Sequence, residues 1–124
     1  MNVITQFTDL EAWKTNHEVV LAIYKITKSF PSDEKFGIID QLRRAASSVT
    51  ANIAEGFGRF HFADKNRFYY QARGSNSEVF NFLILSRDLE ILGKKDFERI
   101  SAMVSEGGRI LNGLIRATEI RTVK

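Results

Sequence analysis

The chain has 124 residues, of which 44% are hydrophobic, with one proline and no cysteine, so we expect one domain (residues 1–124) without disulfides, zinc fingers or a thiol nucleophile. The net charge of +3 is modest and does not by itself indicate a nucleic-acid partner. The sequence has neither a signal-peptide pattern nor an apolar run of membrane length, which predicts a soluble, cytoplasmic protein with no membrane partner.

The first half of the chain predicts two helices. Thr8 and Glu11 have the spacing of a capping box, so the first helix is expected to begin near Thr8 and to end near Ser29. Pro31 then interrupts the helical pattern. The second helix is expected to end at about Gly56, where a glycine can adopt positive φ. Its apolar stripe is Ile39, Leu42, Ala46, Val49, Ile53 and Gly56.

The second half predicts two more helices, one from near Asp64 to Gly93 and one after Gly93. The expected stripe of the third helix is Phe68, Ala72, Ser75, Val79, Phe82, Ser86 and Leu89. The expected stripe of the fourth helix is Phe97, Ile100, Val104, Gly107, Leu111 and Leu114. Short connections between such helices favour antiparallel neighbours, so the predicted fold is an all-α, up-down-up-down four-helix bundle.

A second set of apolar residues lies beside the main stripes of the third and fourth helices. These residues are Phe80, Ile84, Ile91, Met103 and Ile110. A bundle this small is not expected to bury them all, and exposed apolar stripes usually mark interfaces. We therefore predict that the protein forms a homo-oligomer through these residues.

Several short motifs carry a resemblance to a known family. They are Phe30-Pro31, Glu34 with Phe36-Gly37, Gln41 to Ala46 (QLRRAA), Asn52 to Gly56 (NIAEG) with Arg59, and Gly74-Ser75 with Glu78. This pattern resembles the four-helix-bundle proteins encoded in intervening sequences of 23S ribosomal RNA genes, also called S23-like. The resemblance runs from Trp13 to Leu114, with departures at Arg73 and Asn76.

The resemblance implies a cyclic homopentamer with a nucleic-acid role. It also extends distantly to accessory proteins of diversity-generating retroelements, which work beside a reverse transcriptase. The family name does not make the chain a ribosomal protein.

Polar residues on or beside the stripes predict ion pairs that fix the register of the helices. They are Arg43, Arg44, Asn52, Glu55, Ser75 and Glu78. If the second and third helices pair about the turn near Phe60, Arg43 or Arg44 meets Glu78, and Glu55 meets Arg67. An active site or contacts with a ligand or partner are the alternatives.

The sequence contains no motif for a cofactor, a metal or catalysis. The two histidines, His17 and His61, stand apart from each other and from any Glu-x-x-His motif. No phosphate-binding loop is present, and no serine has a histidine and a carboxylate at the spacing of a triad. We therefore predict a non-enzymatic protein without cofactor or metal.

The segment 41–73 is basic, with six Lys or Arg against two Asp or Glu, and its second half mixes cations with aromatic rings. Cations neutralise phosphates and rings stack on unpaired bases. The residues predicted to bind RNA or DNA are Arg59, Lys65, Arg67, Arg73, Tyr69 and Tyr70. The rings could instead close the end of the bundle or form a subunit contact.

Three functions remain open from the sequence. The protein is either an oligomeric nucleic-acid-binding protein, an oligomeric scaffold or accessory protein that binds another protein, or an enzyme with an unrecognised site.

Overall fold

The computed structural model describes residues 3–122, and the predicted single domain (1–124) extends beyond them at both ends. The helices are α1 (Glu11–Thr27), α2 (Ile38–Phe57), α3 (Phe62–Asp88) and α4 (Lys94–Thr122), with short 3-10 helices η1 (Phe7–Asp9) and η2 (Ser32–Glu34). No strand occurs within residues 3–122, so the prediction of an all-α chain with four helices is confirmed.

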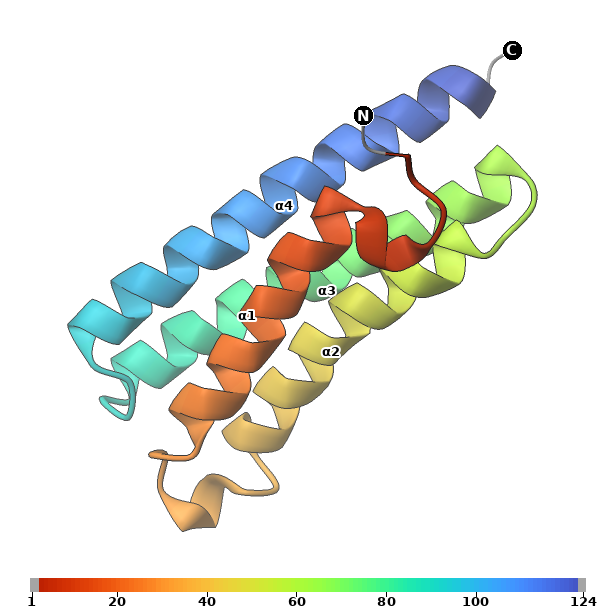
Figure 1. Ribbon diagram of the computed structural model, residues 1–124. Helices are drawn as coiled ribbons and strands as arrows, with labels where there is room; N and C mark the ends of the chain where they lie inside the picture. Colours follow the sequence, from red (N-terminus) through yellow and green to blue (C-terminus); the bar gives the residue numbers. More distant parts are fainter. Residues whose placement is uncertain (1–2, 123–124) are drawn as a thin grey trace.

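The four α-helices lie side by side, and the chain reverses direction at each connection (Figure 1). Hydrogen bonds between α3 and α4 show the same reversal. Asn66, near the start of α3, donates to the carbonyl of Ile115 near the end of α4, and Asn76 donates to the carbonyl of Val104. The α2–α3 turn therefore lies at the same end of the molecule as the start of α1 and the end of α4.

The core has two clusters of buried side chains along the length of the bundle. One includes Leu42, Leu83 and Ile100, and the other, nearer the α2–α3 turn, includes Ile53 and Tyr69. The expected stripes of α2 and α4 match the buried residues closely, but α3 buries Tyr69 and Leu83 in place of Phe68 and Phe82. Because apolar residues are adjacent at both places, periodicity alone could not select the buried one.

Three expected helix ends differ from the structure. Helix α1 begins at Glu11 and not near Thr8. The Asp9 carboxylate accepts hydrogen bonds from the backbone N–H groups of Thr5 and Gln6, and these bonds cap η1, which precedes α1. Helix α2 ends without positive φ, since Gly58 has φ −74°.

Helix α3 ends at Asp88, before the expected Gly93. The chain leaves the helix through Glu90, which has φ 63°, and the backbone N–H groups of Ile91 and Leu92 both donate to the carbonyl of Ser86.

No helix in the described part of the chain is long and apolar enough to cross a membrane.

Candidate nucleic-acid interface

The α2–α3 turn is short and well bonded. The N–H of Gly58 donates to the carbonyl of Ala54, and the N–H of Arg59 donates to the carbonyl of Gly56, before α3 begins at Phe62. The turn and the outer face of the first half of α3 carry three arginines and two rings, which we call the turn surface: Arg59, Phe60, Arg67, Tyr70 and Arg73.

Arg59 and Arg67 share one acidic partner and one ring. Arg59 pairs with Glu55 at 3.1 Å and approaches Asp64 at 3.8 Å, while Arg67 pairs with Asp64 at 2.9 Å. Both guanidinium groups lie over the ring of Phe68, at 4.5 Å and 4.4 Å from its centroid. The two cations are thus held close together beside Phe68, with side chains 40% and 56% exposed.

Tyr70 and Arg73 form a second cation–ring pair on the side of α3 that faces α4. The guanidinium of Arg73 lies 5.1 Å from the Tyr70 centroid and donates to Asn112 Oδ1. The Tyr70 hydroxyl donates to Glu119 Oε1 at 3.3 Å, and partial burial together with this carboxylate raises the pKa of Tyr70. Tyr70 remains 43% exposed, so one face of its ring can meet a ligand.

Two of the residues predicted to bind nucleic acid point elsewhere. Tyr69 is only 2% exposed and belongs to the second core cluster, so it cannot stack on a base. Its ring enters the core because Gly56, which faces it, has no side chain. The ammonium of Lys65 donates to the carbonyl of Phe57 at 2.6 Å, on the inner side of the turn.

The most exposed ring at the turn is Phe60, at 86%, with the His61 ring packed edge-on at 5.0 Å. Sequence reasoning favoured the tyrosines over Phe60 as base-stacking residues. The exposure of Phe60 could have been predicted from its position. It lies between the second and third predicted helices and therefore belongs to neither apolar stripe.

The predicted ion pairs between α2 and α3 are wrong. Arg44 pairs with Asp40, one turn earlier in α2, and Glu55 pairs with Arg59 instead of Arg67. Glu78 is exposed and forms no ion pair within residues 3–122. Neighbours one turn apart on a helix meet more easily than side chains on separate helices.

Other hydrogen bonds connect the helices at these positions. Arg43 reaches α1, where it donates to the hydroxyl of Thr27 at 2.9 Å and lies over the ring of Tyr24. The hydroxyls of Ser48 and Ser75 are 2.9 Å apart and join α2 to α3, and the amide of Asn52 donates to Ser48 Oγ at 3.1 Å. The side-chain hydrogen bonds between α2 and α3 thus include this neutral serine pair and the bond from the Lys65 ammonium to the carbonyl of Phe57.

The residues predicted to form the oligomer interface are half-buried within the protomer. Phe80, Ile91 and Met103 pack against the first core cluster, and Ile110 packs against the second. Ile84 is also of intermediate exposure. The bundle covers more of these side chains than we expected, and their role in an interface stays a prediction.

Fold and surface together define a small all-α protein of four helices with cations and rings gathered at one turn. A sequence model of the 23S rRNA-intervening sequence protein family matches residues 8–113, so the chain belongs to this family.

A crystal structure of a protein with unknown function from the S23 ribosomal protein family, from Bacteroides thetaiotaomicron, has a TM-score of 0.75 to this chain. The two are 22% identical, and the match covers 84% of this chain and 97% of that one, which shows a shared fold. No curated protein matches the chain.

Proposed function

We propose that the protein is a non-enzymatic, oligomeric bundle that binds RNA or DNA through the turn surface. The observation that carries the proposal is the Phe60 ring, 86% exposed, directly after Arg59 in a turn rich in cations. An exposed ring beside cations matches single-stranded nucleic acid, whose bases stack on aromatic side chains and whose phosphates attract arginine.

The ion pairs at the turn leave the arginines available to phosphate. Pairs between exposed side chains contribute about 0–1 kcal/mol, so exchanging Asp64 for a phosphate costs Arg67 little. The planar guanidinium also has five donors, more than one carboxylate can occupy. Arg59 and Arg67 can therefore bind phosphate without a change in the fold.

Oligomerisation would supply the charge that one subunit lacks. In a cyclic assembly every turn surface recurs at the same height, and binding to several of them at once raises the apparent affinity. The family resemblance implies five copies, and this number is part of the proposal.

Fluorescence anisotropy with labelled single-stranded RNA and DNA, in a salt series beginning at about 50 mM, tests the proposal. Affinity should fall linearly with salt on logarithmic axes. Arg67→Gln should reduce that slope by about 0.7 for each phosphate that the protein no longer neutralises. Arg99→Gln is the matched control, because Arg99 is also 56% exposed and also pairs with an aspartate three residues earlier, but near the start of α4.

A second pair of variants tests the ring. Phe60→Ala should weaken binding to single strands about tenfold or more, since stacking contributes about 1–3 kcal/mol per base. Phe36→Ala is its control, because Phe36 is 88% exposed in the connection between α1 and α2, at the opposite end of the bundle. Absence of binding at about 50 mM salt, or equal weakening in both variants, would contradict the proposal.

A scaffold that binds another protein is the second candidate. Leu85 of α3 and Leu89, just after its end, are 40% and 52% exposed, away from the turn surface, and Leu21 of α1 is 52% exposed. If a purified partner bound the chain, Leu89→Glu should abolish that complex and leave anisotropy with nucleic acid unchanged. If Leu89→Glu kept the protein complex but lost binding to nucleic acid, the nucleic-acid function would be favoured.

A further inference from the structure

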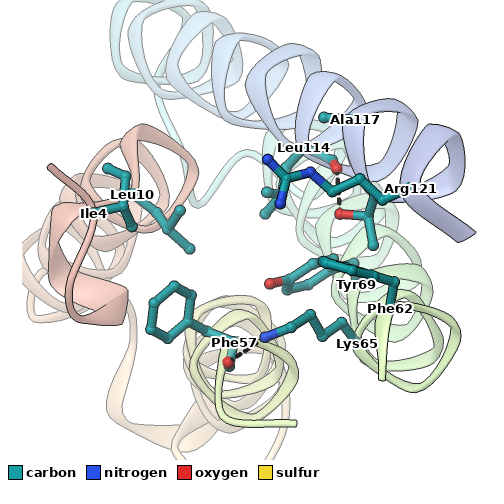
Figure 2. Close-up of a pocket in the computed structure, with 10 residues that line it drawn as sticks. Ile4, Leu10, Phe57, Phe62, Lys65, Tyr69, Leu114, Ala117 and Arg121 are labelled. Carbon is teal, nitrogen blue, oxygen red and sulfur yellow. Dashed lines mark hydrogen bonds between the residues drawn. The ribbon is translucent and has the colours of Figure 1, made fainter. Parts of the chain in front are cut away.

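A cavity of about 410 Å³ opens at the end of the bundle where α2 ends, α3 begins and α4 ends (Figure 2). Its volume lies within the range of small-molecule sites. The apolar part of its wall consists of Ile4, Leu10, Phe57, Phe62, Leu114 and Ala117. The cavity lies on the inner side of the turn, apart from the turn surface.

Three side chains with free hydrogen-bond donors line the same cavity, together with Thr118, whose hydroxyl donates to the carbonyl of Leu114. Figure 2 shows the Tyr69 hydroxyl, the Lys65 ammonium and the Arg121 guanidinium directed toward the space between Leu10 and Phe57. No carboxylate is among the described residues that line it. An apolar cavity with two cations and no acid attracts an anion.

Tyr69 offers the cavity a hydroxyl that has no partner of its own. Only 2% of the residue is exposed, yet its hydroxyl has no hydrogen-bond partner within residues 3–122. The hydroxyl is not among the fully buried, unpartnered side-chain atoms of the described residues, so it is open to the cavity. The hydroxyl points into the cavity, so a bound acceptor would supply the missing hydrogen bond.

Lys65 also has unused donors. Its ammonium gives one hydrogen bond to the carbonyl of Phe57 and lies 5.1 Å from the centroid of that residue's ring. An ammonium has three donors, so two remain for a ligand. Arg121 lies over Phe62 at 5.4 Å and has no carboxylate within ion-pair distance in the described chain.

We propose that this cavity binds a small-molecule carboxylate with an apolar body, the carboxylate accepting from Tyr69, Lys65 and Arg121 and the body lying against Leu10 and Phe57.

The protonation of the donors fits this ligand. Burial raises the pKa of Tyr69 to about 12, so the hydroxyl keeps its proton and donates at neutral pH. Burial also lowers the pKa of Lys65, and a bound anion would offset that desolvation by favouring the charged ammonium. A bare inorganic anion would leave the apolar wall without contacts.

Ligand-observed NMR and calorimetry with 3-phenylpropionate and octanoate test the proposal. The first probe is aromatic and the second is a flexible chain, so the pair distinguishes flat from extended bodies. The corresponding alcohols, 3-phenylpropanol and 1-octanol, and inorganic phosphate are the controls. At about 5 mM ligand, a site with a Kd of about 1 mM is mostly filled, and we expect saturable binding of at least one carboxylate.

Variants assign the binding to the cavity. Tyr69→Phe keeps the ring and should weaken carboxylate binding about tenfold, as the loss of one hydrogen bond to a charged group predicts. Lys65→Met should weaken it at least as much. The controls are Tyr24→Phe and Lys14→Met, on α1, which should bind as the unmodified chain does.

Several results would overturn the proposal. These are no saturable carboxylate binding, equal binding of the alcohols or of phosphate alone, and unchanged affinity in Tyr69→Phe. Circular dichroism would show whether Lys65→Met unfolds. If it did, the carboxylate affinity of Tyr69→Phe would still show whether the ligand binds in the cavity. Tyr69→Phe removes no cation and no residue of the turn surface, so with this variant nucleic-acid binding and carboxylate binding can succeed or fail independently.

Discussion

Three asparagine side chains attach α4 to its neighbours. Asn16 of α1 donates to the carbonyl of Gly107 at 3.2 Å, and Asn66 and Asn76 of α3 donate to the carbonyls of Ile115 and Val104, each at 3.1 Å. Asn16 also donates to the carbonyl of Ala12 in its own helix at 2.7 Å, and a Cβ at Gly107 would clash with the Asn16 side chain. A one-turn slip of α4 would place residues with side chains at the positions of Gly107 and Gly108, and a Cβ at Gly108 would lie 2.9 Å from Asn76 Oδ1.

Gly56 permits a close approach of α2 and α3. A Cβ there would lie 2.7 Å from Tyr69 Cε1 and 2.8 Å from the backbone oxygen of Lys65. We expect Gly56→Ala to lower the free energy of unfolding by about 1–3 kcal/mol, as overpacking does. Gly113→Ala is the control, because a Cβ at Gly113 meets nothing within 4 Å.

In the control, alanine's higher helix propensity should stabilise the protein by about 0.5–1 kcal/mol. Urea unfolding of the two variants measures both effects, and similar free energies would show that α2 and α3 are not closely packed at Gly56.

Tyr69 should make stability depend on alkaline pH. Its folded pKa of about 12 exceeds the usual 10.0, so the folded state holds the phenolic proton more tightly than the unfolded state. The resulting stability is fully present below pH 10 and is lost as the pH rises toward 12.

Between about pH 9 and pH 11, the unmodified chain should lose about 1 kcal/mol more than Tyr69→Phe. Urea unfolding at both pH values measures the difference, and other titrating groups cancel because they are common to both chains. Equal losses of stability in the two chains would show that the phenol is solvated.

At the scale of the elements, the α3–α4 connection contains the only residue with positive φ in the described chain, Glu90 at φ 63°. This conformation costs a residue with a Cβ about 1–2 kcal/mol, and glycine adopts it freely. Glu90→Gly should therefore stabilise the protein by about 0.5–1 kcal/mol, after glycine's greater entropy in the unfolded chain is subtracted.

Glu90→Ala is the matched control, since alanine loses the glutamate side chain but keeps the Cβ. Thermal unfolding should show a higher Tm for the glycine variant alone. A rise in both variants would attribute the gain to removal of the charge.

At the scale of the whole molecule, we expect self-association. Exposed apolar side chains occur on α1 (Leu21, 52%) and just after the end of α3 (Leu89, 52%), and the resemblance implies five subunits. Light scattering coupled to size exclusion should give a mass several times the 14.2 kDa of one chain. A mass of one chain over a wide concentration range would contradict this prediction and weaken the nucleic-acid proposal, which depends on repeated turn surfaces.

The helical class, the number of helices and most of the buried positions in α2 and α4 can be predicted from the amino-acid sequence alone. Apolar residues repeat there at intervals of three and four, and a stripe with this period has only one face that can be buried. Leu42, Val49 and Ile53 were selected in this way, as were Ile100, Val104 and Leu111. The short motifs also identified the family.

The contacts between polar groups on different helices are visible only in the folded chain. The helical repeat shows which face of a helix a residue occupies, but it does not show which residue of a neighbouring helix lies at the same level along the bundle. The ion-pair partners predicted for Glu78 and Arg67 were therefore wrong. The same ambiguity hid the asparagines that hold α4. Tyr69 and Lys65 turn inward because Gly56 admits the Tyr69 ring and the carbonyl of Phe57 accepts from Lys65. Such contacts arise between distant segments, and no spacing within one helix specifies them.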